Sequence, residues 1–260
     1  KAAFNYKKFY EVTYEAQRLM DDLVDLELEH VERILNKIKN DPEPGYIKSV
    51  EEETWKLFYN SGKKGRRTGL GFTALADTIA AMGLKFDSDA SLDIIEQIMI
   101  TKCTAEFDSS IDMAIERGKF TAFDPEIEHL SEFVHMLKKD MPHVYKRMML
   151  HGRRNISLST VAPTGSISIL SQTSSGIEPV FQTNYIRRKK INPNDKNASI
   201  DYVDSTGDSW QEFEVYHPKL KTWMDVNQKS DITDNPYIGS TAAEIDWLKR
   251  IRIQSIVQKY

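Results

Sequence analysis

Apolar residues recur at three- and four-residue steps through the first 40 residues, between acidic and basic ones. This spacing puts the apolar side chains on one face of a helix, so it predicts a long helix that packs by that face. The segment Asp-Pro-Glu-Pro-Gly at 41–45 ends the helix, because proline lacks the backbone N–H that helical bonding needs. A second, shorter helical pattern covers residues 50–59. The positions that carry the first pattern are Leu19, Leu23, Val24, Leu26, Val31, Ile34, Leu35 and Ile38.

More helical patterns follow, and then the character of the sequence changes. Residues 74–82 form a helical pattern that ends at Gly83, and residues 87–118 form a long one that ends at Gly118. Beyond Asn155, apolar and small polar residues alternate, as they do in strands. Long helices that lead into short strands favour an α/β fold. The other expected elements are helices at 126–151 with a restart at Pro142, at 217–224 and from a capping box at 241–244, and strands at 156–161, 167–170 and 185–190.

Composition excludes several classes of protein. Of the 260 residues, 40% are hydrophobic and 28% are charged, which is ordinary for a globular protein. The formal net charge is −4, so neither nucleic acid nor a membrane is an expected partner, and no apolar run is long enough to span a bilayer. Cys103 is the one cysteine, which excludes an internal disulfide and indicates a reducing, cytoplasmic setting. A start at Lys1 without Met and an end at Tyr260 inside a helical pattern are typical of a piece of a larger protein.

Serine, threonine and glycine dominate residues 157–181, around an expected turn at 162–166. Successive backbone N–H groups around a glycine can point inward together and bind an anion. The hydroxyls of Thr164, Ser166 and Ser168 would add donors, and Gly165 permits close approach. A plain hairpin turn is the alternative, and composition alone favours it.

Several motifs, in order and at matching spacing, resemble the large catalytic chain of ribonucleotide reductases. The resemblance is greatest to the adenosylcobalamin-dependent, class II members, and it covers nearly the whole chain, least between 192 and 240. The motifs are RRTGLGF at 66–72 with LAD at 75–77, DSSIDMA at 108–114 with ERG at 116–118, APTGSIS at 162–168, SSGIEPVF at 174–181 followed by Arg187 and Arg188, and IQSIVQKY at 253–260.

This resemblance implies a ten-stranded α/β barrel, of which residues 1–260 would be a single partial domain, the second half, with 192–240 as a candidate surface insertion. The implied reaction replaces the 2′-hydroxyl of a ribonucleoside diphosphate or triphosphate with hydrogen by thiyl-radical chemistry, which makes deoxyribonucleotides for DNA replication. Adenosylcobalamin is implied as cofactor, and the implied partners are the ribonucleotide, the missing upstream half of the chain, a thioredoxin-like reductant and a second copy in a homodimer. Carried over residue by residue, the substrate phosphate contacts are Thr164, Gly165, Ser166, Ile167 and Ser168.

The thiols of the family are absent from this chain. The radical cysteine sits in an Asn-x-Cys-x-Glu motif, which the sequence lacks, and a reducing pair needs two cysteines where one exists. Cys103 lies inside a helical pattern, so it is expected to be a buried structural thiol. We therefore expect no catalytic residue in this chain and no turnover by the isolated chain.

Two other functions stay open. Related motifs occur in class I chains, which take their radical from a separate metal-containing subunit, although GIEPVF at 176–181 favours class II. The other alternative is a nucleotide-binding module without catalysis. The basic clusters at 63–67 and 187–190 are interpreted as solvated loops. The six histidines show no metal-binding spacing, and Glu178 is expected to be a structural carboxylate fixed by backbone donors.

Overall fold

The structure is a computed structural model that describes residues 2–192, 199–229 and 231–260. It divides into two compact units, each assembled from segments far apart in the sequence. Unit 1 comprises Lys1–Phe4, Phe72–Leu92 and Pro163–Gln254, and unit 2 comprises Asn5–Gly71, Asp93–Ala162 and Ser255–Tyr260. No helix of the described residues is both long and apolar enough to cross a membrane.

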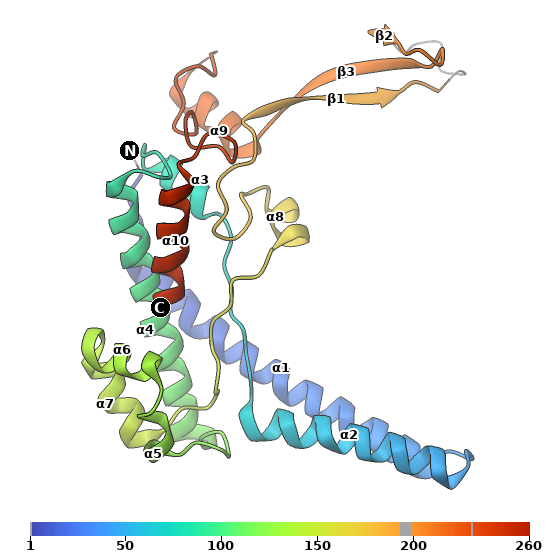
Figure 1. The fold of residues 1–260 in the computed structure, drawn as a ribbon, viewed down its shortest axis with the longest axis vertical. Helices are drawn as coiled ribbons and strands as arrows, with labels where there is room; N and C mark the ends of the chain where they lie inside the picture. The colour runs from blue at the N-terminus through green and yellow to red at the C-terminus, as the bar shows by residue number, and fades with distance from the viewer. Residues whose placement is uncertain (1, 193–198, 230) are drawn as a thin grey trace. The chain divides into compact units, whose positions relative to one another are not determined.

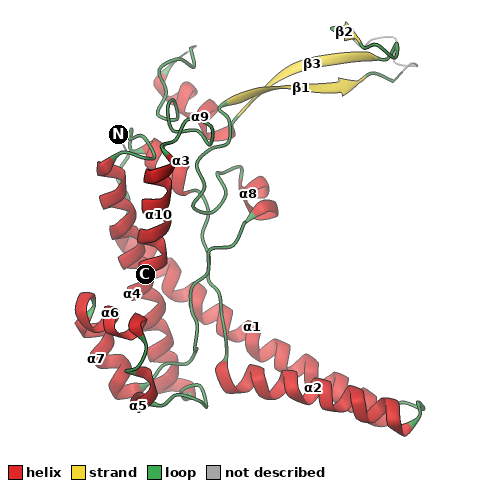
Figure 2. Ribbon diagram, viewed as in Figure 1, coloured by secondary structure: helices red, strands yellow, loops and turns green. Residues whose placement is uncertain are grey.

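Helices dominate unit 2, as the periodicity predicts. Helix α1 (Tyr6–Asn40) and helix α2 (Gly45–Gly65) lie side by side as an antiparallel pair (Figures 1 and 2). The other helices of this unit are α4 (Asp89–Arg117), which begins in unit 1, and α5 (Pro125–Glu128), α6 (Glu132–Asp140) and α7 (Pro142–His151). Three of the expected helix boundaries are confirmed: a break after Asn40, the end of α4 before Gly118 and the restart at Pro142. The break covers only residues 41–44, because α2 begins at Gly45 and not at the expected residue 50.

One expected loop in unit 2 is wrong. Helix α2 continues to Gly65, so Lys63 and Lys64 lie in its last turn rather than in a basic loop. Cations at a helix C-terminus interact favourably with the helix dipole, which explains how the helix accommodates them. The core of this unit includes fully buried residues of α4, α6 and α7, namely Ile95, Ile98, Met99, Ile111, Met113, Leu137, Val144 and Met148.

The expected strand at 156–161 is extended and pairs in parallel with residues 68–70. Thr68 N donates to Ser157 O at 3.1 Å and Leu70 N donates to Leu158 O at 2.7 Å. The pairing is short, a single parallel bridge between Leu70 and Ser159. It is nevertheless the geometry that neighbouring strands of an α/β protein adopt.

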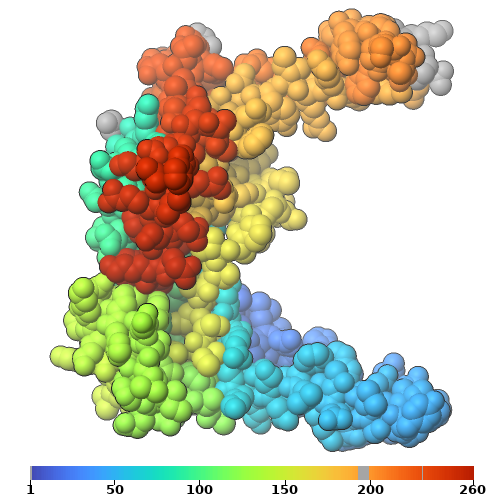
Figure 3. Space-filling model, viewed as in Figure 1, coloured from blue at the N-terminus to red at the C-terminus, as the bar shows by residue number. Residues whose placement is uncertain are grey.

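Unit 1 carries helices α3 (Leu75–Ala81), α8 (Gly165–Ser171) and α9 (Pro218–Asn227), and α10 (Trp247–Lys259) begins in it. Its antiparallel sheet has the order β1-β3-β2, from β1 (Asn184–Lys190), β2 (Tyr202–Val203) and β3 (Ser209–Tyr216). In Figure 3 the β1–β3 pair extends as an arm from the rest of this unit. The strand expected at 185–190 is confirmed, and part of the polar excursion at 192–216 proves to be strand, although residues 193–198 lie outside the described residues.

Two expectations in unit 1 are wrong. Residues 167–170 belong to helix α8 and not to a strand, because the N–H of Ser168 donates to Thr164 O at 2.7 Å and closes a helical turn. The last helix begins at Trp247, after the expected capping box. Within the expected capping box, the Thr241 hydroxyl donates to the Glu244 carboxylate at 2.7 Å, and this bond closes a turn separate from the helix. The chain is thus an α/β protein of long helices and short strands, and closure into a barrel stays a prediction.

Candidate functional site

The serine-rich loop of unit 1 folds back on itself around Thr164. Thr164 lies in the left-handed region, at φ 50°, immediately before α8. A residue with a Cβ disfavours that conformation by roughly 1–2 kcal/mol, so the loop must supply compensating bonds. One is the 2.9 Å bond that Gly176 N donates to Thr164 Oγ1, twelve residues along the chain. This bond therefore joins the motif at 162–168 and the motif at 174–181 into one loop.

Ser168 holds this loop together. Its side chain is buried, its Oγ donates to Gly165 O at 3.0 Å and lies 2.8 Å from Ser175 Oγ, and its N–H donates to Thr164 O. The hydroxyl and the N–H of Ser168 thus both have partners within the loop.

The first turn of α8 presents donors without partners. The first N–H groups of a helix have no acceptor within the helix, which here concerns Gly165, Ser166 and Ile167. All three residues are exposed, and the Ser166 hydroxyl makes no hydrogen bond to another residue that the structure describes. A Cβ built on Gly165 would meet nothing within 4 Å, so the space beside it is open. Three backbone donors and one hydroxyl can therefore meet an incoming anion.

Asp77 of α3 fixes the far end of the loop. Its Oδ2 accepts from Ser174 N at 2.7 Å, and its Oδ1 accepts from Tyr237 OH at 2.9 Å and lies 2.7 Å from His217 Nε2. Burial, and then the Asp77 charge, raise the pKa of Tyr237 above its usual value, so the phenol keeps its proton and donates. Ala74 N also donates to Ser174 O at 2.9 Å. The LAD motif at 75–77 and the serine loop are thus held in one piece.

A pocket of about 820 Å³ opens beside this loop, entirely within unit 1. Of the five expected phosphate contacts, Ser168 lines it, whereas residues 164–167 do not. Glu178 also lines the pocket, but its carboxylate pairs with Arg250 rather than with backbone donors, which corrects the expectation. The rest of the lining includes Thr173, Ser174, Ser175, Tyr185, Arg187, Val215 and His217.

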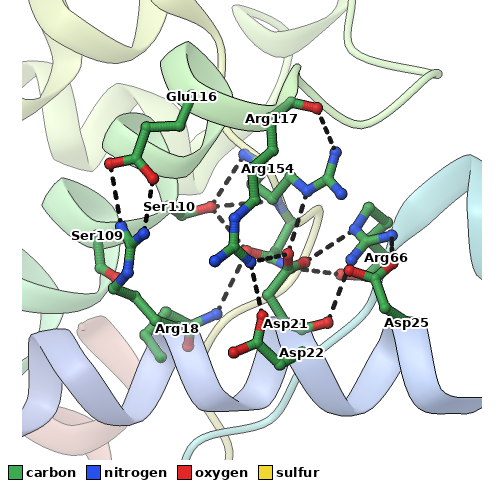
Figure 4. Close-up of polar contacts among 12 residues, drawn as sticks. Arg18, Asp21, Asp22, Asp25, Arg66, Ser109, Ser110, Glu116, Arg117 and Arg154 are labelled. Carbon is green, nitrogen blue, oxygen red and sulfur yellow. Dashed lines mark hydrogen bonds and ion pairs between the residues drawn. The ribbon is translucent and has the colours of Figure 1, made fainter.

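Unit 2 contains a buried polar network that the sequence did not suggest. Asp21 is fully buried on α1, and it accepts from Arg66 Nε at 2.8 Å, Asn155 Nδ2 at 2.8 Å and Arg154 Nε at 3.1 Å (Figure 4). Burial alone would raise the pKa of Asp21, but the bonds from Arg66, Asn155 and Arg154 outweigh it and lower the pKa. Arg66 also pairs with Asp25 at 2.7 Å. Arg66 is therefore a buried structural cation, and the interpretation of residues 63–67 as a solvated loop is wrong for it.

The same network joins the two motifs of unit 2 at 66–72 and 108–114. Gln17 Nε2 donates to Thr68 Oγ1 at 2.9 Å, and Ser110 Oγ donates to Asn155 Oδ1 at 3.0 Å. The network thereby fixes the segment after α2 and the segment after α7 against α1 and α4 (Figure 4). One signal could have revealed it. Gln17 and Asp21 lie on the buried stripe of α1, where a polar side chain requires a partner.

A buried ion pair on α4 holds the two extended segments. Lys102 Nζ donates to Glu106 Oε1 at 2.6 Å, to Leu70 O at 2.8 Å and to Ser159 Oγ at 2.5 Å. Burial raises the pKa of Glu106 to about 7, against the opposing effect of Lys102. Lys102 of α4 thus forms a hydrogen bond with each of the two residues of the parallel bridge, Leu70 and Ser159.

Cys103 is buried, and the described histidines belong to no cluster that could hold a metal ion. Cys103 is a buried thiol within α4, as expected, and burial raises its pKa well above its usual value, so it is unreactive. Across the described ranges, no three His, Cys, Asp or Glu residues are placed to hold a metal ion.

Comparison with known proteins decides the family. The model of the ribonucleotide reductase barrel domain matches residues 1–260. The chain belongs to this family. The vitamin B12-dependent ribonucleoside-diphosphate reductase of Mycobacterium tuberculosis is 34% identical over 122 residues, which is 47% of this chain and 15% of that protein. The B12-dependent enzyme of Thermoplasma acidophilum is 27% identical over 70% of this chain and 18% of its own length. The ribonucleoside-diphosphate reductase large subunit of Plasmodium falciparum is 25% identical over 72% of this chain and 21% of its own.

The matched regions of these relatives are short compared with the whole proteins. This chain spans between 15% and 21% of the length of the three relatives described. Two of the three names specify B12 and one does not, so the family is shared by proteins with and without B12 in their names.

Proposed function

We propose that this chain is the part of a ribonucleotide reductase catalytic chain that holds the substrate phosphates. The whole protein would convert ribonucleoside diphosphates or triphosphates to deoxyribonucleotides. The observation that carries the proposal is the loop from Thr164 to Gly176, closed by its own bonds, with the donors of residues 165–167 open beside Gly165. The names of the relatives, all ribonucleoside-diphosphate reductases, support it.

The residues of the loop divide into binding and holding groups. The N–H groups of Gly165, Ser166 and Ile167 and the Ser166 hydroxyl would donate to phosphate oxygens. Thr164 and Ser168 would fix the turn, because their side chains already bond within the loop. A turn that is held before substrate arrives loses little conformational entropy on binding, which favours tight binding of the phosphate.

The larger assembly is part of the same proposal. Residues 68–70 and 157–160, already paired in parallel, would be neighbouring strands of the ten-stranded barrel, and 192–240 would be a surface insertion. The family resemblance alone suggests a thioredoxin-like reductant and a homodimer. The single cysteine is the reason to place the protein in a reducing cytoplasm.

Adenosylcobalamin is the radical source that we favour, because of the 176–181 motif and the B12-dependent relatives. His217, the imidazole that lines the 820 Å³ pocket, has its Nε2 2.7 Å from Asp77 Oδ1, so that nitrogen is engaged within unit 1. No residue described here is assigned to the cofactor. A class I chain with a separate radical subunit is the second candidate, and the Plasmodium relative favours it.

Replacing Ser166 by alanine in the complete enzyme tests the phosphate loop. We expect nucleotide binding to weaken by about 0.5–1.5 kcal/mol, or by up to about 3 kcal/mol if the hydroxyl bonds a charged phosphate. Isothermal titration calorimetry with ribonucleotide would measure it. Ser171→Ala is the matched control, because that hydroxyl, at the other end of α8, donates to Ile167 O and should not affect binding. Equal affinity of the Ser166 variant and the wild type would contradict the assignment.

The isolated 260-residue chain should not reduce nucleotides, because its one thiol is buried and its reaction needs three. Incubating the chain with ribonucleotide, adenosylcobalamin and dithiothreitol, followed by chromatography of the nucleosides, is the measurement. Formation of deoxyribonucleotide would overturn the expectation. For the complete protein, binding without reduction under every radical source would favour the nucleotide-binding module.

A further inference from the structure

Helix α1 carries two apolar stripes, and the packing of unit 2 covers only one of them. The buried residues of α1 are Thr13, Gln17, Asp21, Val24, Val31 and Ile38. Three apolar positions of the sequence pattern lie elsewhere, because Leu19, Leu23 and Leu26 are 65%, 55% and 50% exposed. Val12 is exposed as well. The spacing therefore describes two stripes, one packed and one open, rather than the single packing face that it predicted.

The open side chains form one continuous surface, which we call the open stripe: Val12, Leu19, Leu23 and Leu26. Steps of seven, four and three residues bring them to the same side of a helix, along about four turns. Helix α2 runs along another side of α1, where the Tyr59 hydroxyl donates to Glu32 at 2.7 Å (Figure 1). A single exposed leucine is ordinary on a protein surface, whereas a continuous apolar stripe marks a packing surface.

The strands beside α1 also lack neighbours. Asp21 of α1 accepts hydrogen bonds from Arg66 and Asn155, which lie just before the extended segments at 68–70 and 157–160. These segments pair with each other, and no further strand that the structure describes pairs with either of them. Two paired strands are marginally stable alone, so the sheet needs more strands and helices to cover them. Helices that cover neighbouring strands pack side by side, and the open stripe offers the surface for such a contact.

We propose that the open stripe of α1 binds an amphipathic helix of the upstream half of the catalytic chain. The proposal rests on the proposed function, because the upstream half is inferred from the family resemblance. This chain spans only 15–21% of the three relatives described, so most of each relative lies outside the matched region. A second copy of this chain would meet the stripe with its own stripe in a two-fold interface. Such a copy would cover the leucines but would bring no strand to the open edges beside α1, so we favour the upstream half.

Photo-cross-linking in the full-length reductase tests this interface. The photoreactive residue p-benzoylphenylalanine replaces Leu23 in one variant and Asn36 in the control. Asn36 is an exposed residue of the same helix that lies off the open stripe by helical spacing. After irradiation and proteolysis, mass spectrometry identifies the peptides that are joined to α1. We expect the probe at position 23 to be joined to a peptide upstream of Lys1, and we expect the probe at position 36 to lose that product.

The outcomes separate this inference from the proposed function. Cross-links from position 23 to α1 of a second copy, or to a peptide downstream of Tyr260, would overturn the inference. The absence of any cross-link, in a protein that still binds ribonucleotide, would also overturn it, while the phosphate-loop assignment stands. A protein that forms the upstream cross-link but binds no ribonucleotide would keep the interface and contradict the phosphate loop. Should the probe at Leu23 prevent folding, the probe at Leu26, on the same stripe, decides by the same products.

Discussion

Replacing Asp21 by alanine should lower the free energy of unfolding by about 3–5 kcal/mol, the usual cost of removing one partner of a buried ion pair. The substitution leaves the guanidinium of Arg66 and the amide of Asn155 buried without their shared acceptor. Urea unfolding at pH 7, followed by far-ultraviolet circular dichroism, measures the loss. Because the folded state lowers the pKa of Asp21, this stabilisation is present above its usual pKa of 3.8 and is lost as the pH falls through the lower, folded value. The difference in the free energy of unfolding between the Asp21→Ala variant and the wild type should therefore become smaller at acidic pH.

Asp22→Ala is the matched control for that experiment. Asp22 is the next residue of α1, its side chain is half exposed, and it pairs with Arg117 at 2.6 Å. An exposed pair contributes only about 0–1 kcal/mol, so this variant should unfold almost like the wild type. If Asp21→Ala were equally mild, the network of Figure 4 would not be what holds the segments after α2 and α7.

The helices could be predicted because their apolar spacing is a local signal repeated over many turns. The break at 41–44 and the end of α4 before Gly118 follow from single residues whose backbone preferences are strong. Residues 167–170 offered only four alternating positions, too few to distinguish a strand from a helix. The conformation of Thr164 and the backbone bond from Ser168 N to Thr164 O decided the outcome, and neither is visible as a pattern.

The site could be predicted only where residues close in sequence act together. The serine loop is one such case, because its motifs lie within twenty residues of one another. The role of Arg66 is the opposite case. Its partner Asp21 lies 45 residues earlier, so the local pattern showed only a run of positive charge. Arg187 and Arg188 look alike in sequence, and only the register of β1 against β3 assigns them to different faces.

Replacing Lys102 by methionine should destabilise the protein by about 3–5 kcal/mol at pH 8, and by clearly less at pH 5. The carboxyl of Glu106 is buried, and without Lys102 it would have to be neutral in the folded protein. At pH 5, protonating the Glu106 carboxyl costs little free energy. At pH 8, the Glu106 carboxyl ionises in the unfolded chain, and this ionisation favours the unfolded state. Even in the wild type, burial raises the pKa of Glu106 from 4.5 to about 7. Its contribution to stability is therefore complete below pH 4.5 and is lost as the pH rises through 7.

The control for this prediction removes the carboxylate instead of changing the pH. In the double variant Lys102→Met with Glu106→Gln, no buried carboxyl has to take up a proton on folding, so the cost at pH 8 should fall below that of Lys102→Met alone. Unfolding curves of the wild type and of these two variants at both pH values complete the comparison. A pH-independent cost for Lys102→Met would mean that Glu106 is not the titrating group. The pair would then act through the hydrogen bonds from Lys102 to Leu70 and Ser159, which fasten the parallel bridge to α4.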